Sequence, residues 1–214
     1  MKFIENIFFD LDGTLVDSKK DIISAVQNAL KENKLPAKTS EEIMFHIGSS
    51  IEYLLKKSAG NVSEAVLQKC SSDYEKYYKN HYLENTSIFM GVKDVLENFR
   101  DKNKFIVTNR RYGSSKRLLK TLGIDKHFKD IIGGDDLSCL KPSSCPLDNI
   151  ISRHKLKKDK TVFIGDMPVD VLAGKQAGVI TCAVTYGFSK KEDIIKTNPD
   201  FVIDSMNQLT NLFN

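Results

Sequence analysis

Two acidic residues follow an apolar segment near the start of the chain. Phe8-Phe9 precede Asp10, and Asp12 follows two positions later, ahead of Gly13. Side chains two positions apart on an extended segment point to the same side, so both carboxylates can face one site. Carboxylates that close repel each other unless one holds a proton or a cation lies between them. A magnesium ion would let Asp10 remain ionised while Asp12 exchanges a proton. A simple polar turn is the alternative interpretation of this segment.

A second acidic pair, Asp166 and Asp170, follows the apolar run Phe163–Gly165. Pro168 suits the first turn of a helix, which would bring Asp170 over the same helix start. Magnesium prefers a few carboxylates together with substrate oxygens and water, and two such strand ends could supply them. The alternative is that Asp166 only caps the helix.

Between the two acidic pairs lie residues that suit a phosphate group. Thr108 and Asn109 end an apolar segment with a hydroxyl, an amide and backbone N–H groups. Lys141 precedes Pro142, and a lysine ammonium is a compact charge suited to a phosphoryl oxygen. A turn at Thr108-Asn109 and a surface role for Lys141 are the alternatives.

The elements that position these residues are predicted from the hydrophobic pattern. Short apolar runs alternate with amphipathic stretches, which is typical of strand–helix units around a parallel sheet. We expect strands at Ile4–Phe9, Lys104–Thr108, Ile131–Gly133, Thr161–Gly165, Ile180–Val184 and Phe201–Ile203. We expect helices between them at Gly91–Lys102, Gly113–Leu122, Ser144–His154, Pro168–Ala177, Lys190–Lys196 and Ser205–Phe213.

Residues 17–85 have a different pattern, with three apolar helical faces and no convincing strand. Ser18 and Ser63 are candidate N-caps of two of these helices. We therefore expect an α/β fold: a Rossmann-like three-layer core with a central parallel sheet, formed by residues 1–16 and 86–214. A small all-helical cap domain, residues 17–85, would be inserted after the first strand. Because ligands bind at the carboxyl ends of parallel strands, this insert is suited to act as a lid.

Taken in order, the four motifs resemble those of the haloacid dehalogenase-like superfamily of phosphohydrolases. They are Asp-x-Asp-Gly-Thr, Thr-Asn, Lys-Pro and Gly-Asp-x-x-x-Asp. Asp12–Ser18, Gly133–Asp136 and Pro146-Leu147 are most similar to the phosphoglycolate phosphatase-like branch, and so is the helical insert.

The resemblance implies a magnesium-dependent phosphatase that hydrolyses a small phosphorylated metabolite, a phosphoglycolate-like phosphomonoester. Asp10 would attack phosphorus in line and become an aspartyl phosphate. Asp12 would protonate the leaving alcohol and then take a proton from the hydrolytic water.

The resemblance also implies the binding residues. The Asp10 and Asp166 carboxylates and the Asp12 backbone carbonyl would bind Mg²⁺, and Asp170 would orient that shell or bind through water. Thr108, the backbone N–H of Asn109 and Lys141 would hold the phosphoryl oxygens.

Three other functions share part of this pattern. A β-phosphoglucomutase-like phosphomutase shares the same core motifs and remains the alternative. Dehalogenases of the superfamily generally lack an acid two residues after the nucleophile, so Asp12 argues against that chemistry. A receiver-like module that is merely phosphorylated at Asp10 gains nothing from an adjacent acid–base group.

Composition and charge limit the classes of partner that we expect. The net charge is +4, with 32 Lys and Arg scattered among 28 Asp and Glu, so we expect no nucleic-acid partner. We find neither the apolar stretch of a signal peptide nor a membrane-spanning segment, and we expect a cytoplasmic enzyme.

Two smaller expectations concern residues near the proposed site. We expect the four cysteines to be free thiols, because a chain of 214 residues does not need disulfides. Cys139 and Cys145 flank Lys141. Arg110 follows Asn109 and could bind a substrate carboxylate or second phosphate, but we expect it to face solvent.

Overall fold

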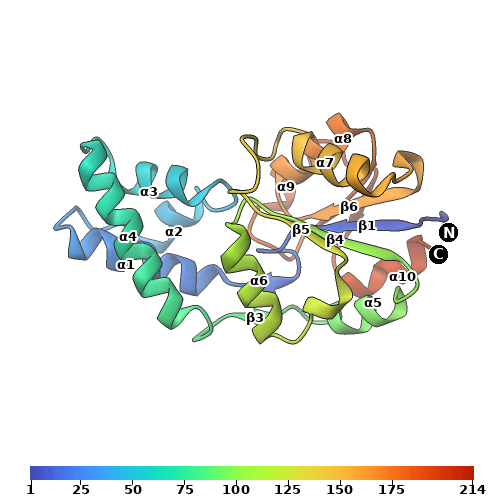
Figure 1. Ribbon diagram of the computed structural model, residues 1–214, viewed down its shortest axis with the longest axis horizontal. Coiled ribbons are helices and arrows are strands. Elements are labelled where there is room, and N and C mark those ends of the chain that lie inside the picture. Colours follow the sequence, from blue (N-terminus) through green and yellow to red (C-terminus); the bar gives the residue numbers. More distant parts are fainter. The chain divides into compact units, whose positions relative to one another are not determined.

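Six parallel strands form the central sheet of the computed structural model, which describes residues 1–214 (Figure 1). Their order across the sheet is β5-β4-β1-β6-β7-β8. The strands are β1 (Asn6–Phe9), β4 (Asn103–Val107), β5 (Asp130–Ile132), β6 (Thr161–Gly165), β7 (Ile180–Val184) and β8 (Phe201–Ile203). The predicted α/β class with a central parallel sheet is confirmed.

Strand β1 lies in the middle of this sheet, which explains its unbroken apolar sequence. It pairs with β4 on one side and β6 on the other, and all four of its residues are buried. Phe9 is level with Ile106 of β4 and with Ile164 of β6. The residues that follow β1, β4 and β6 therefore emerge at one edge of the sheet.

Helices cover the sheet on both faces. Figure 1 shows α7 (Cys145–His154) and α8 (Pro168–Ala177) on one side of it, and α5 (Val92–Asn98) and α10 (Leu209–Leu212) on the other. The remaining helices of this unit are α6 (Tyr112–Thr121), α9 (Lys191–Ile195) and 3-10 turns at Asp125–His127, Lys158–Lys160 and Met206–Gln208. The arrangement is the three-layer core expected from the strand–helix alternation.

The bounds of β6, β7, β8 and α8 agree with the prediction residue for residue. The helix predicted at Ser205–Phe213 is instead two short pieces, the 3-10 turn and α10. The turn begins at Ser205, whose side chain and that of Gln208 form a capping box.

Residues 17–87 form a second compact unit made of helices. These are α1 (Lys19–Glu32), α2 (Ser40–Met44), α3 (Ile51–Ala59) and α4 (Glu64–His81), and α1 packs along α4. The prediction missed α2, whose five residues are too few to show a helical period and whose start is fixed by a Thr39–Glu42 capping box.

The two predicted N-caps of this unit differ. The Ser63 side chain accepts a hydrogen bond from the Val66 N–H at the start of α4, as expected. Ser18 precedes α1 but makes no side-chain capping bond, because its backbone angles (φ −101°, ψ 3°) are not those of a capping residue. That part of the prediction was wrong.

The chain passes between the two units through β2 (Val16–Asp17) and β3 (Ser87–Ile88), which form a two-stranded sheet. Within the helical unit, buried Asp21 of α1 binds the chain just before β3. Its Oδ2 accepts from the Thr86 N–H at 2.9 Å and from the Thr86 hydroxyl at 2.7 Å. Asp21 thus holds the beginning and the end of the helical unit together. None of the helices of either unit is long and apolar enough to cross a membrane.

Candidate active site

Asp10 follows β1 and lies at the centre of a buried charge cluster. Its residue is 6% exposed. The Lys141 Nζ donates to Asp10 Oδ1 at 2.6 Å and to Asp170 Oδ1 at 2.7 Å. One ammonium therefore bridges carboxylates from β1 and α8, and the surface role considered for Lys141 is excluded.

Asp166 follows β6 and is completely buried. Its Oδ1 accepts from the Thr14 hydroxyl at 3.0 Å, and its Oδ2 accepts from the Phe188 N–H at 2.7 Å. Both partners hold the carboxylate in one orientation. Sequence reasoning missed them, because neither lies in a pattern that predicts contact with Asp166.

Two glycines allow the backbone to approach Asp166 this closely. A Cβ at Gly13, where φ is +87°, would lie 2.1 Å from Asp166 Oδ2. A Cβ at Gly187 would lie 2.3 Å from the Asp166 Cβ. Any larger residue at either position would displace the carboxylate.

Asp170 lies in the first turn of α8. Its Oδ2 accepts from the Met167 N–H at 2.9 Å, so Asp170, and not Asp166, caps this helix. The helix-capping alternative for Asp166 is therefore wrong. Gly165 leaves space for Asp170, since a Cβ there would lie 2.3 Å from the Asp170 Cβ.

Asp10, Asp166 and Asp170 each offer a carboxylate oxygen, and the three oxygens lie within 4.8 Å of one another. If all three are ionised, the single ammonium of Lys141 leaves two negative charges uncompensated. Hard oxygen ligands with a surplus of two negative charges fit a divalent cation such as Mg²⁺.

The electrostatics of the cluster agree with this deficit of positive charge. Burial raises the pKa of Asp10 to about 7, although Lys141 acts in the opposite direction. Burial, together with Asp10 and Asp170, raises the pKa of Asp166 well above its ordinary value. Burial alone would lower the pKa of Lys141, but Asp10 and Asp170 outweigh it and raise that pKa. Two carboxyl groups are thus poised to hold protons unless a cation replaces them.

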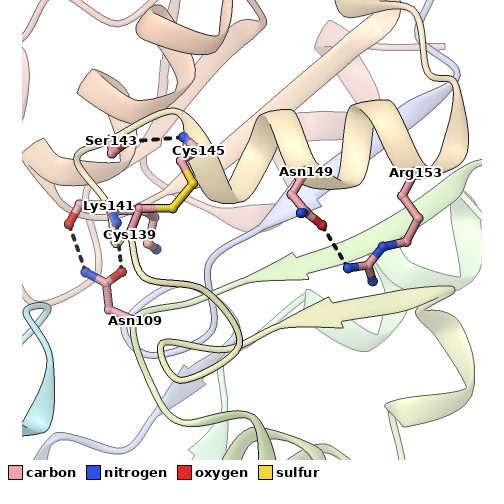
Figure 2. Close-up of a disulfide and its surroundings, with 7 residues drawn as sticks. All are labelled: Asn109, Cys139, Lys141, Ser143, Cys145, Asn149 and Arg153. Atoms are coloured by element: carbon pink, nitrogen blue, oxygen red, sulfur yellow. Dashed lines mark hydrogen bonds between the residues drawn. A yellow bond between two sulfur atoms is a disulfide. The ribbon is translucent and has the colours of Figure 1, made fainter.

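The loop that carries Lys141 is fastened to the end of β4 by Asn109 (Figure 2). The Asn109 Nδ2 donates to the Lys141 carbonyl at 3.1 Å, and the Lys141 N–H donates to Asn109 Oδ1 at 3.0 Å. Thr108, Asn109 and Lys141 are all buried. The Asn109 side chain therefore positions the lysine, a role that sequence reasoning did not foresee.

A disulfide also constrains this loop, and the expectation that all four cysteines are free thiols was wrong. Figure 2 shows Cys139 bonded to Cys145, at the start of α7, on either side of Lys141. Their Cα atoms lie 6.2 Å apart. Only Cys70 and Cys182 are free, and both are buried. Chain length predicts only whether the whole fold needs disulfides. It does not exclude a bond such as this one, which closes a local loop between cysteines six positions apart.

Asp12 faces a different partner. The Arg110 Nε donates to Asp12 Oδ2 at 2.7 Å, and its Nη2 donates to Asp12 Oδ1 at 2.7 Å. The side chains are 8% and 13% exposed, respectively. The expectation that Arg110 faces solvent was wrong, because the Asp12 carboxylate draws the guanidinium inward.

The structure thus brings Asp10, Asp166 and Asp170 together in one buried cluster, in which Lys141 contacts Asp10 and Asp170. Thr108 and Asn109 directly follow the neighbouring strand β4. Asp12 lies two positions after Asp10 and is paired with Arg110. Such a site can hold a divalent cation, a nucleophilic carboxylate and cationic donors for an anion.

Comparison with known proteins agrees with this description. Residues 7–184 match the model of the haloacid dehalogenase-like hydrolase family. A phosphoglycolate phosphatase of Haemophilus influenzae is 31% identical, over 96% of this chain and 96% of that protein. That of Vibrio parahaemolyticus is 30% identical, over 96% of this chain and 94% of that protein.

Solved structures are similar along their full length. The crystal structure of a predicted phosphoglycolate phosphatase from Haemophilus somnus superimposes with a TM-score of 0.94, at 26% identity and 99% coverage of both chains. A haloacid dehalogenase-like protein of Streptococcus pneumoniae gives a TM-score of 0.87, at 26% identity and 98% coverage of both chains.

Proposed function

Because the chain belongs to the haloacid dehalogenase-like hydrolase family and is a phosphatase, we propose that it hydrolyses a small phosphomonoester with Mg²⁺ and Asp10 as nucleophile. The observation that carries the proposal is the buried cluster of the Asp10, Asp166 and Asp170 carboxylates, in which Lys141 pairs with Asp10 and Asp170.

In this proposal the Asp10 and Asp166 carboxylates and the Asp12 backbone carbonyl hold Mg²⁺, and Asp170 orients these ligands or binds the ion through water. The surplus of negative charge and the raised pKa values of Asp10 and Asp166 support such a site. When bound, the ion keeps Asp10 ionised and offsets charge on the phosphoryl oxygens.

Asp10 begins the reaction. One of its carboxylate oxygens forms a bond to phosphorus while the bond from phosphorus to the ester oxygen breaks, giving an aspartyl phosphate and an alkoxide. Asp12 gives its proton to the alkoxide, which leaves as the alcohol.

Water completes the cycle. Asp12, now ionised, takes a proton from a water molecule that attacks the same phosphorus atom, and the bond to Asp10 breaks. Inorganic phosphate and the original Asp10 carboxylate result. Asp12 is again protonated and ready for the next substrate.

Thr108, the backbone N–H of Asn109 and Lys141 hold the phosphoryl oxygens. Fixed donors of this kind stabilise the charge that develops in the transition state, because they need no reorganisation during the reaction. The two hydrogen bonds between the Asn109 side chain and the Lys141 backbone support such a fixed arrangement.

The substrate class in this proposal is a phosphoglycolate-like phosphomonoester, supported by relatives that are named phosphoglycolate phosphatases. Residues 17–85 form a cap domain that selects the substrate, and residues 1–16 and 86–214 form the core domain. A cytoplasmic location is part of the same proposal.

The nucleophile is tested with Asp10→Asn, which keeps the size of the side chain and removes its nucleophilic oxygen. Phosphate release from 2-phosphoglycolate is measured for both proteins in Mg²⁺, with circular dichroism to verify the fold. We expect a folded variant with no turnover above background. Turnover that survives the substitution would refute the role of Asp10.

A further inference from the structure

We propose that Arg110 is a positioning residue for the reaction, which holds the Asp12 carboxylate in the orientation needed for proton exchange with the substrate. This inference rests on the proposed function, in which Asp12 is the acid and base. It assigns a role to a residue that none of the four sequence motifs includes.

The contact between the two side chains has the geometry of a fork. Two nitrogens of the guanidinium donate to the two different oxygens of Asp12, each at 2.7 Å. Paired parallel bonds fix the plane of a carboxylate as well as its distance, which one bond to a lysine would not do. Two carboxylate oxygens offer about four lone-pair sites, so each Asp12 oxygen keeps a site outside the fork that can face a substrate or a water molecule.

Arg110 is in turn held by its surroundings. Its third nitrogen, Nη1, donates to the Ser114 hydroxyl at 3.1 Å, and its backbone N–H donates to Thr108 Oγ1 at 3.2 Å. Its carbonyl accepts from the Gly134 N–H at 2.8 Å. A residue whose backbone and side chain are both held in place loses little freedom when it binds a partner, so it is suited to orient that partner.

The glycine pair Gly133-Gly134 is what lets this segment pack so closely. A Cβ at Gly133 would lie 2.9 Å from the Arg110 carbonyl oxygen, and one at Gly134 would lie 2.2 Å from the Asn109 carbonyl oxygen. The loop after β5 therefore packs directly against the backbone on either side of Arg110, and both glycines help to fix the position of Arg110.

Since Asp12 acts on the leaving group, its placement matters most for substrates that leave as a strongly basic alkoxide. The alcohol of 2-phosphoglycolate needs the proton, whereas p-nitrophenolate is a stable anion that leaves without one. Removal of Arg110 should therefore affect these two substrates unequally, which a general loss of structure would not do.

The experiment compares Arg110→Gln, Arg110→Lys and Ser114→Ala with the wild type in Mg²⁺. We expect Arg110→Gln to lower kcat/KM about 100-fold for 2-phosphoglycolate and less than about 10-fold for p-nitrophenyl phosphate. Arg110→Lys, which keeps the charge without the fork, should recover only part of the loss. Ser114→Ala should produce a smaller loss with the same substrate preference. Arg117→Gln, on the exposed side of α6, is the matched control and should match the wild type.

A double-mutant comparison tests whether Arg110 affects the activity through Asp12. If Arg110 acts through Asp12, then Asp12→Ala combined with Arg110→Gln has the same activity as Asp12→Ala alone. Independent, additive losses would overturn the inference, as would equal losses for both substrates. Ser114→Ala and Arg110→Lys keep the test decisive if Arg110→Gln fails to fold.

The outcomes separate this inference from the proposed function. A wild-type protein that hydrolyses 2-phosphoglycolate, with Arg110→Gln equal to Arg117→Gln, would overturn the role of Arg110 alone. A wild-type protein without Mg²⁺-dependent hydrolysis would overturn both.

Discussion

The Lys141 Nζ lies 2.6 Å from Asp10 Oδ1, although 131 positions separate the two residues in the chain. The same nitrogen lies 2.7 Å from Asp170. The contact joins β1, the loop before α7 and the first turn of α8, so it depends on the whole core and not on any one segment.

Lys141→Gln should cost both stability and activity. Without the ammonium, Asp10 and Asp170 are left buried without that partner, and loss of one partner from a buried ion pair typically costs about 3–5 kcal/mol. Loss of the proposed donor to the phosphoryl group should lower kcat about 100-fold or more. Urea unfolding in EDTA and phosphate release in Mg²⁺ measure the two effects.

The matched control is Lys158→Gln. Lys158 forms an exposed ion pair with Asp148 at 2.9 Å, and its loss should cost less than about 1 kcal/mol. Equal unfolding free energies for the two variants would contradict the buried ion network described for Lys141.

Much of this site follows from the sequence, for a physical reason. Apolar runs such as Thr161–Gly165 predict buried parallel strands, and the carboxyl ends of neighbouring parallel strands meet at one edge. Asp10, Thr108 and Asp166 could therefore be placed near one another without coordinates.

What the sequence did not predict are contacts that depend on exact side-chain geometry. The fork between Arg110 and Asp12 joins residues 98 positions apart, and the bond from Thr14 to Asp166 spans 152 positions. Neither has a local pattern. The Cys139–Cys145 bond depends on how the loop folds back on α7, which spacing alone leaves open.

Binding of Mg²⁺ should strengthen as the pH rises from about 6 to about 8. The pKa of Asp10 in the folded protein is raised to about 7, so below that pH the metal must displace a proton. For each proton that Mg²⁺ must displace, its affinity falls up to about tenfold with each pH unit below the pKa. Calorimetric titration of EDTA-treated protein with MgCl₂ measures this dependence.

Without metal, this titration changes the free energy of unfolding in the opposite direction as the pH rises. An acid whose pKa is raised on folding binds its proton more tightly in the folded state, so the stability that Asp10 contributes to the metal-free protein should be lost as the pH rises from about 4 to about 7. Added Mg²⁺ should reverse this trend. Asp10→Asn removes one of the two carboxyl groups with a raised pKa and should weaken both pH dependences. An Mg²⁺ affinity that does not change with pH would contradict the proposed ligand set.

Reduction of the disulfide should weaken the protein. A bond that closes so short a loop contributes about 2 kcal/mol in the chain-entropy model. Dithiothreitol should therefore lower the melting temperature by about 4–8 °C. Activity should fall with it, because Lys141 lies within the closed loop.

Thiol titration provides the control. Denatured protein should show two free thiols before reduction and four after it, from Cys70, Cys182 and the reduced pair. Cys139→Ser should no longer respond to dithiothreitol, while Cys70→Ser should respond as the wild type does. Four thiols without reductant would rule out the disulfide in solution.

Gly187→Ala should weaken metal binding more than it perturbs the rest of the fold. Its Cβ would overlap Asp166, at 2.3 Å from the Asp166 Cβ. Gly113→Ala is the comparison, because an added Cβ there meets nothing within 4 Å and Gly113 is the second residue of α6. That change should stabilise the protein by up to about 1 kcal/mol, because it reduces the freedom of the unfolded chain. Unchanged Mg²⁺ affinity in Gly187→Ala would show that Asp166 is not a ligand.

Phosphate release from a panel of phosphorylated metabolites, in Mg²⁺ and in EDTA, tests the central claim most directly. The panel contains 2-phosphoglycolate, sugar phosphates, nucleoside monophosphates and pyrophosphate. We expect strong release from 2-phosphoglycolate or a close small phosphomonoester, and none in EDTA. Release that persists in EDTA would contradict the magnesium-dependent mechanism. The result that would contradict hydrolysis is no phosphate release from any compound of the panel. If β-glucose 1-phosphate is then converted once a bisphosphorylated sugar is added, the protein is a phosphomutase.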